Sequence, residues 1–243
     1  MSGSDDLSDN HSLISTIRSN LAPVHPDGHK FLYIAVPVAL VLLFLWIPLG
    51  LIAGAVAVYI AYFFRDPVRV TPLRDGLIIS PADGRISSIE TVKPPPELGL
   101  GSDERLRISI FLSVFDVHIN RSPVAGKITR SVYVPGAFLN AALDKASEEN
   151  ERRSLVITTS AGTEIAVVQI AGLIAKRIVT FKGEGTSLGV GERFGLIRFG
   201  SRVDVFLPPG KGCLAAVGQR AVGGETVLAD LKSDEPEREA RAT

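Results

Sequence analysis

Three residues in this sequence have the side chains of an acid, a base and a nucleophile, and each stands in a distinctive local motif. Asp83 lies in Ser-Pro-Ala-Asp-Gly-Arg, His118 in Asp-Val-His-Ile-Asn-Arg, and Ser201 in Phe-Gly-Ser-Arg-Val-Asp. A carboxylate that orients an imidazole, which then takes the proton of a hydroxyl, activates serine for attack on a carbonyl. Because geometry and not chain order defines such a triad, these residues are candidates that the fold must bring together.

The Gly200-Ser201 pair has two interpretations. Glycine weakens a strand and often marks a bulge, which is the simpler explanation. The alternative is a strained peptide bond whose serine attacks the carbonyl of the preceding residue. In that case, glycine removes a side chain that would obstruct the attack.

Two aspartates are candidates for the carboxylate that orients His118. Asp83 is the first, although Asp-Gly between two strand-like runs is also a strong hairpin signal. If the His118 motif is a strand, Asp116, His118 and Asn120 share one face, which makes Asp116 the second candidate.

Composition excludes several classes of site. His11, His25 and His29 precede the body of the chain, where His118 is the only histidine, and Cys213 is the only cysteine. A three-histidine zinc site, a cysteine cluster and an intramolecular disulfide are therefore excluded from the body, and we expect no metal. Lys plus Arg and Asp plus Glu both number 26, so no net charge points to nucleic acid.

Short β-branched runs separated by turn residues must position these side chains. Their spacing predicts a mainly β fold, a compact sandwich or barrel. The stretch from Lys182 to Gly195 is rich in glycine but precedes a strand-like run, so we expect tight β-turns and not a phosphate loop. One stretch, Ala141–Arg153, is expected to be a helix or a charged loop. The seven expected strands are Leu77–Ser80, Arg85–Val92, Leu106–Val114, Gly126–Tyr133, Ser154–Thr159, Glu164–Ile170 and Arg202–Leu207.

An apolar N-terminal segment predicts a helical membrane anchor. Phe31–Phe64 contains 34 residues without a charge or histidine. One straight helix of that length would span roughly 50 Å, too long for a hydrocarbon core of about 30 Å. Pro48 and Gly50 interrupt it, so we expect a hairpin of two helices, either crossing the membrane or turning back within it. Basic residues on both flanks favour cytoplasmic ends, and the alternative is a buried hairpin in a soluble protein.

The expected organisation has four parts. Residues 1–28 are a flexible tail, 29–64 the membrane-associated helical hairpin, 65–231 a β-rich catalytic domain and 232–243 a charged tail.

Taken together, the motifs resemble those of the phosphatidylserine decarboxylase family, in particular its short members. The resemblance covers roughly Tyr62–Pro208 and rests on several motifs in the right order behind an apolar segment. These are Phe63-Phe-Arg-Asp-Pro, Ser80-Pro-Ala-Asp-Gly, Phe115-Asp-Val-His-Ile-Asn-Arg-Ser-Pro-Val-Ala-Gly, Ile170-Ala-Gly-Leu-Ile-Ala-Lys-Arg-Ile and Gly195-Leu-Ile-Arg-Phe-Gly-Ser-Arg.

The resemblance implies a proenzyme that cleaves itself between Gly200 and Ser201. The serine attacks the Gly200 carbonyl, and β-elimination of the resulting ester leaves a pyruvoyl group, derived from Ser201, as the covalent cofactor. Residues 1–200 become the β subunit and 201–243 the α subunit of a heterodimer, which can assemble into a higher oligomer. The family's triad aspartate and histidine match Asp83 and His118.

The resemblance also implies the substrate and the location. Phosphatidylserine in the cell membrane would be converted to phosphatidylethanolamine through a Schiff base, by a catalytic domain facing the cytoplasm. Arg121 is a candidate for binding the lipid phosphate, with Arg65 and Arg69 as further possibilities. Three alternatives stay open: a decarboxylase for another serine phospholipid such as archaetidylserine, a membrane-anchored serine hydrolase, and a non-enzymatic β-domain.

Overall fold

The structure, a computed structural model, describes residues 22–137, 149–172, 177–198 and 200–233, together with residues 235, 238 and 241. The chain divides into two compact units, Met1–Val68 and Arg69–Thr243. The described part of the first unit consists mainly of helices, and that of the second consists mainly of strands.

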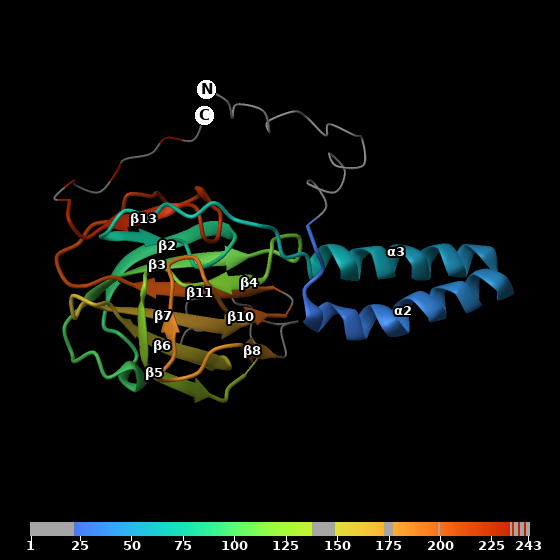
Figure 1. Ribbon diagram of the computed structural model, residues 1–243, viewed down its shortest axis with the longest axis horizontal. Helices are drawn as coiled ribbons and strands as arrows, with labels where there is room; N and C mark the ends of the chain where they lie inside the picture. Colours follow the sequence, from blue (N-terminus) through green and yellow to red (C-terminus); the bar gives the residue numbers. More distant parts are fainter. Residues whose placement is uncertain are drawn as a thin grey trace, which may run out of the picture. The chain divides into compact units, whose positions relative to one another are not determined.

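Two helices of the first unit, α2 (Pro26–Leu45) and α3 (Ile47–Phe63), lie side by side (Figure 1). Trp46, the residue between them, has an extended backbone, and Pro48 lies in the first turn of α3, where a missing N–H breaks no helical bond. Gly50 permits close packing, since a Cβ atom there would lie 2.2 Å from the Cα of Leu43. Two helices of about 30 and 25 Å therefore replace one helix that would be too long for a bilayer.

The helices expose most of their apolar side chains. Phe44 is 92% exposed and Tyr33 76% exposed, whereas few residues of either helix are buried. By length and composition α2 could cross a membrane, whereas α3, at 17 residues, is shorter. An apolar surface of this extent on helices is typical of contact with lipid or another apolar partner.

Within the residues that the structure describes, the second unit contains thirteen strands and one short 3-10 helix, η1 (Pro96–Leu98). The strands are β1 (Leu77–Ile79), β2 (Gly84–Val92), β3 (Arg105–Leu112), β4 (Ile119–Arg121), β5 (Gly126–Val134), β6 (Arg152–Thr158), β7 (Glu164–Ala171), β8 (Ile178–Thr180), β9 (Ser187–Leu188), β10 (Arg193–Ile197), β11 (Ser201–Phe206), β12 (Arg220–Ala221) and β13 (Val227–Asp230).

These strands form three antiparallel sheets. The largest has eight strands in the order β12-β2-β3-β11-β7-β6-β5-β9 and curls into a half-barrel. A three-stranded sheet has the order β4-β10-β8, and β1 pairs with β13. Strand β11, which begins at Ser201, lies inside the large sheet and is bonded to β3 on one side and β7 on the other.

Side-chain alternation along β11 separates two cores. Val203 and Val205 belong to the main core with residues from both larger sheets, whereas Phe206 belongs to a smaller cluster with Val168 and Ile170. Because successive side chains of a strand point to opposite faces, Ser201 shares the face of Val203 and the main core. We call this the inner face of the large sheet.

The mainly β prediction is confirmed, and each of the seven expected runs contains a strand within a few residues of its expected ends. The hairpin expected at Asp83-Gly84 is wrong, because β1 and β2 belong to different sheets and the dipeptide connects them. Of the stretch expected to be a helix or charged loop, residues 141–148 lie outside the described part, and Arg152 and Arg153 belong to β6. Strand pairing between β6 and β7 overrides the local helical pattern there.

Candidate active site

Ser201 is the first residue of β11, and its position is unusual for a serine. Its side chain is completely buried on the inner face, and its Oγ has no hydrogen-bond partner in the described part of the chain. In register, Ser201 lies between Leu112 of β3 and Ala171 of β7. A buried hydroxyl without a partner lowers stability, so a role in chemistry is a reasonable explanation for it.

Gly200 adopts a left-handed backbone conformation with φ +57°, directly before this serine. Among the described residues, the nearest neighbour of a Cβ added to Gly200 would be Val114 Cγ1, at 3.9 Å. The backbone angle therefore favours glycine at this position, whereas crowding by the described residues does not. The bulge and strained-bond interpretations both predicted an unusual backbone here, and the structure adds that its position is the turn into a central strand.

His118 lies immediately before β4 and is 3% exposed. The Nδ1 atom of His118 is 2.9 Å from the backbone oxygen of Asp116. The backbone carbonyl of His118 accepts a hydrogen bond from the N–H of Ile197, at 3.3 Å. Since β10 ends at Ile197, three residues before Gly200 in sequence, this hydrogen bond is close in sequence to the Gly200-Ser201 bond. The contact to the Asp116 carbonyl favours the tautomer that carries its proton on Nδ1.

Asp83 is buried in the connection between β1 and β2. Its Oδ2 is 2.6 Å from Arg69 Nη2, and its Oδ1 accepts a hydrogen bond from the N–H of Gly223, at 2.7 Å. Burial raises the pKa of Asp83 above its ordinary value and the negative charge of Asp116 adds to this, while Arg69 and the Gly223 N–H act in the opposite direction. Arg69, which was one of the further candidates for phosphate binding, thus forms an ion pair with the candidate catalytic residue Asp83.

Asp116 does not lie on a strand face with His118 and Asn120, as the sequence pattern predicted. It belongs to a turn before β4, in which its Oδ2 accepts hydrogen bonds from the N–H and the hydroxyl of Ser113. Its Oδ1 is 3.1 Å from Nη2 of Arg220. Since Arg220 and Gly223 contact the two candidate carboxylates, the segment 220–223 holds Asp116 and Asp83 in the same neighbourhood.

The remaining arginine candidates have contacts of their own. Arg121 is 6% exposed and donates from Nη1 to the carbonyl of Gly191, at 3.2 Å. In the first unit, the guanidinium carbon of Arg65 lies 3.8 Å from the centre of the Tyr62 ring. Neither contact tests a role in phosphate binding, which stays a prediction.

The glycine-rich stretch forms turns, as expected. Gly185 and Gly191 have positive φ angles, and the stretch leads through β9 into β10 without a helix. Gly185–Gly189 matches the Gly-x-Ser-x-Gly pattern of serine hydrolases, but its Ser187 is exposed in β9. That pattern places serine at a strand-to-helix turn, which is absent here, so the hydrolase alternative gains no support.

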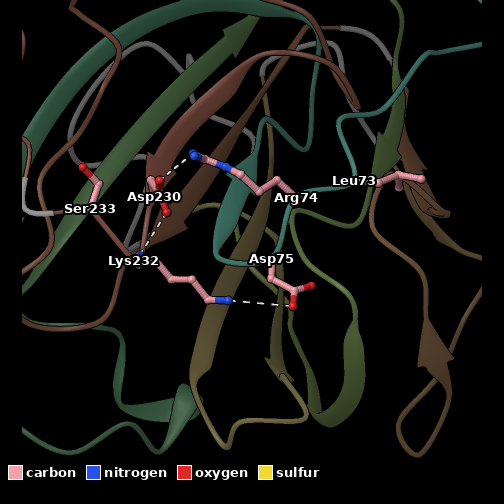
Figure 2. Close-up of a pocket in the computed structure, with 6 residues that line it drawn as sticks. All are labelled: Leu73, Arg74, Asp75, Asp230, Lys232 and Ser233. Carbon is pink, nitrogen blue, oxygen red and sulfur yellow. Dashed lines mark hydrogen bonds and ion pairs between the residues drawn. The ribbon is translucent and has the colours of Figure 1, made fainter.

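A hollow of about 730 Å³ is lined by Leu73, Arg74, Asp75, Asp230, Lys232 and Ser233 (Figure 2). Its charged side chains pair with one another: Arg74 Nη2 is 2.5 Å from Asp230 Oδ2, and Lys232 Nζ is 3.8 Å from Asp75 Oδ2. None of the predicted site residues lines it. We assign it no part in the chemistry.

Two buried polar pairs were missed by sequence reasoning. Gln169 donates from Nε2 to Asn120 Oδ1, at 2.7 Å, on the inner face. On the opposite face, Arg202 forms two hydrogen bonds to the carboxylate of Asp204, at 2.8 and 2.9 Å. Their signal was a polar residue inside an apolar strand-like run, which becomes interpretable only when the pairing of the strands is known.

The described part is a β domain in which Ser201, directly after the left-handed Gly200, is buried in a central strand, while Asp83 and Asp116 are both contacted by the segment 220–223. The family model described as phosphatidylserine decarboxylase matches residues 56–229. A protein of Xanthobacter autotrophicus named phosphatidylserine decarboxylase proenzyme is 56% identical over 229 residues, which cover 94% of this chain and 98% of the relative. The chain therefore belongs to the phosphatidylserine decarboxylase family and is a decarboxylase, as its motifs indicated.

Proposed function

We propose that this chain is a pyruvoyl-dependent phosphatidylserine decarboxylase that matures by cutting itself between Gly200 and Ser201. The observation that carries the proposal is a buried serine hydroxyl that finds no hydrogen-bond partner within the described part of the chain, together with a left-handed glycine directly before it. The word proenzyme in the name of the relative agrees with a chain that is processed after synthesis.

The residues at this bond fit the formation of a pyruvoyl group from Ser201. Among the residues that the structure describes, its Oγ has no hydrogen-bond partner, so we propose that it adds to the carbonyl carbon of Gly200, which moves the acyl group from nitrogen to oxygen as an ester. Removal of the Cα proton of residue 201 then expels the Gly200 carboxylate. The remaining dehydroalanine takes up water and loses ammonia, which leaves pyruvoyl at the new N-terminus.

His118 is the proposed proton carrier for both stages. As a neutral imidazole it would take the hydroxyl proton of Ser201 during cleavage, and as an imidazolium it would protonate the substrate carbon after carbon dioxide has left. Asp83, with Arg69 and Gly223 fixing its two oxygens, would stabilise the charged imidazole. When formed, the pyruvoyl carbonyl supplies the electron sink that a decarboxylation at the α-carbon of an amino acid requires.

The substrate we propose is phosphatidylserine within a membrane. A diacyl lipid stays in the bilayer, which accounts for an enzyme with the exposed apolar helices α2 and α3. Lys30 near one end of the hairpin and Arg65 beyond the other favour cytoplasmic ends and a catalytic unit on that side. Arg121 is the proposed phosphate ligand, and fragments 1–200 and 201–243 are the proposed β and α subunits.

The intact mass of the purified full chain tests this proposal. Wild type should give two fragments split after Gly200, with the smaller one lighter than a serine-started peptide by one ammonia. The Ser201→Ala variant should give one species of 25.9 kDa and no phosphatidylethanolamine from phosphatidylserine in detergent micelles. A cleaved Ser201→Ala chain, or an intact wild-type chain that still decarboxylates the lipid, would refute the pyruvoyl mechanism.

A further inference from the structure

A pair of buried amides on the inner face leaves two polar groups without partners among the described residues. Asn120 and Gln169 are both completely buried and share one hydrogen bond, from Gln169 Nε2 to Asn120 Oδ1. Asn120 Nδ2 and Gln169 Oε1 make no hydrogen bond within the part of the chain that the structure describes. Two amides joined by one hydrogen bond always leave a donor and an acceptor in this way, whichever way each amide is turned.

Strand register makes Gln169 a diagonal neighbour of Ser201. Gln169 lies two residues before Ala171, the residue opposite Ser201, and shares its face of β7. Diagonal neighbours of this kind are about 7–8 Å apart, which is the scale of a small headgroup. Asn120 lies two residues after His118, opposite Gly195 of β10.

Gly195 makes room for the pair. A Cβ atom at this position would lie 3.1 Å from Gln169 Nε2, tighter than an ordinary contact, and 2.6 Å from the carbonyl oxygen of Val179. Because Gly195 has no side chain, the Gln169 amide can lie over the three-stranded sheet and reach Asn120. Apolar residues at positions 120 and 169 would fill the core without leaving unsatisfied polar groups, so packing alone does not explain the two amides.

We propose that Asn120 and Gln169 form the subsite for the amino-acid end of a serine headgroup, an inference that rests on the proposed function. A carboxylate beside an ammonium needs one hydrogen-bond donor and one acceptor, which are the two groups that the pair leaves open. The spare N–H of Asn120 donates to the substrate carboxylate, and the spare carbonyl of Gln169 accepts from the substrate ammonium. Both contacts are to charged groups and are therefore stronger than neutral ones.

The same arrangement distinguishes substrate from product. An ethanolamine headgroup has the ammonium but no carboxylate, so it loses the contact to Asn120 and leaves a buried donor unpaired again. A site built to bond a polar group disfavours an analogue without that group. Product is therefore held more weakly than substrate, which favours its release.

The decisive variant is Asn120→Leu/Gln169→Met, which replaces both amides by apolar groups of similar shape. Removing two unsatisfied groups together should leave the melting temperature equal to or above that of wild type. Self-cleavage should proceed. In detergent micelles the KM for phosphatidylserine should rise about 10- to 100-fold, and kcat, calculated per cleaved chain, should change less. The inhibition constant of the product phosphatidylethanolamine should rise by a smaller factor than the KM for phosphatidylserine.

Ser109→Ala is the matched control. Ser109 Oγ is also buried and without a partner among the described residues, but Ser109 is paired with Asp204 in register and faces away from Ser201. Its removal should leave the KM unchanged.

Each outcome decides the question. A double variant with wild-type KM overturns the subsite, as does one that no longer folds, because the proposal requires the amides to be dispensable for stability. A folded double variant that fails to cleave itself assigns the pair to maturation and also overturns it. Asn120→Asp supplies a second test, since a carboxylate there should repel the substrate carboxylate and raise the KM further. A wild-type chain that neither cleaves nor decarboxylates would instead sink the proposed function.

Discussion

The left-handed conformation of Gly200 leads to a prediction that separates two reasons for a glycine at the cleavage point. An alanine with φ near +57° brings its Cβ too close to the following carbonyl oxygen, which costs about 1–2 kcal/mol. No atom of the described residues adds to this cost, because the nearest one would be Val114 Cγ1 at 3.9 Å. A loss of this size lowers the melting temperature by about 2–8 °C in a unit of this length.

The same free energy limits the effect on cleavage. If Gly200 is needed only for its backbone angle, Gly200→Ala depletes the reactive conformation by about 5- to 30-fold and the chain still matures. Gly200→Asn should perform better than Gly200→Ala, because asparagine tolerates the left-handed region better than most residues. If glycine is needed to keep the carbonyl uncovered, the longer asparagine side chain should be at least as harmful as alanine.

Two measurements on the full chain in detergent decide between these explanations. Freshly translated protein is sampled over time, and the uncut and cut chains are quantified by intact mass. Melting temperatures are measured in a Ser201→Ala background, where every chain stays uncut. An asparagine variant that cleaves no faster and melts no higher than the alanine variant would refute the conformational explanation.

Three further predictions concern the site and its supports. His118→Ala should slow self-cleavage by about 100- to 10,000-fold if His118 is the general base, as seen in a time course of fragment formation; rapid cleavage would assign the proton to another group. Arg69→Met removes the cation that lowers the pKa of Asp83, so this pKa should rise further and the acidic limb of the pH profile for self-cleavage should move to higher pH. A limb that stays in place would show that ionised Asp83 is not required. Arg202→Met should lower the free energy of unfolding by about 3–5 kcal/mol, because Asp204 is then buried and unpaired. In thermal unfolding of the uncut chain, Arg202→Met/Asp204→Leu should recover most of this loss; no recovery would show that the ion pair stabilises the fold by more than its desolvation costs.

Much of the architecture was readable from local pattern. Runs such as 164–170 combine β-branched residues with turn residues at both ends, so their strands could be predicted within one or two residues. The break between the helices was predicted close to Pro48 and lies at Trp46, whereas Pro37 lies inside α2 without ending that helix.

Strand pairing was not readable in the same way. The Asp83-Gly84 dipeptide has the composition of a hairpin turn, yet the chain uses it to pass from one sheet to another. The glycine there meets a tertiary constraint, since a Cβ on Gly84 would lie 2.2 Å from the carbonyl oxygen of Phe111. Local composition is the same for both uses, so only long-range pairing distinguishes them.

The candidate site shows the same division. Residue types and motifs were sufficient to select Asp83, His118 and Ser201, but not to find what surrounds them. Arg69 as the partner of Asp83, and Gln169 as the partner of Asn120, come from segments 14 and 49 residues away in sequence. No periodicity in a single strand contains that information.

The central position of β11 has a consequence for the two pieces of a cut chain. A break after Gly200 would give the shorter piece an end embedded in the sheet, with Ser201–Phe206 bonded to a neighbour along both edges. That piece would also contribute β12 and β13, which pair with β2 and β1 of the longer piece. Dissociation would then require the sheet itself to open, so the pieces should separate no faster than the whole unit unfolds, and dilution alone should not part them.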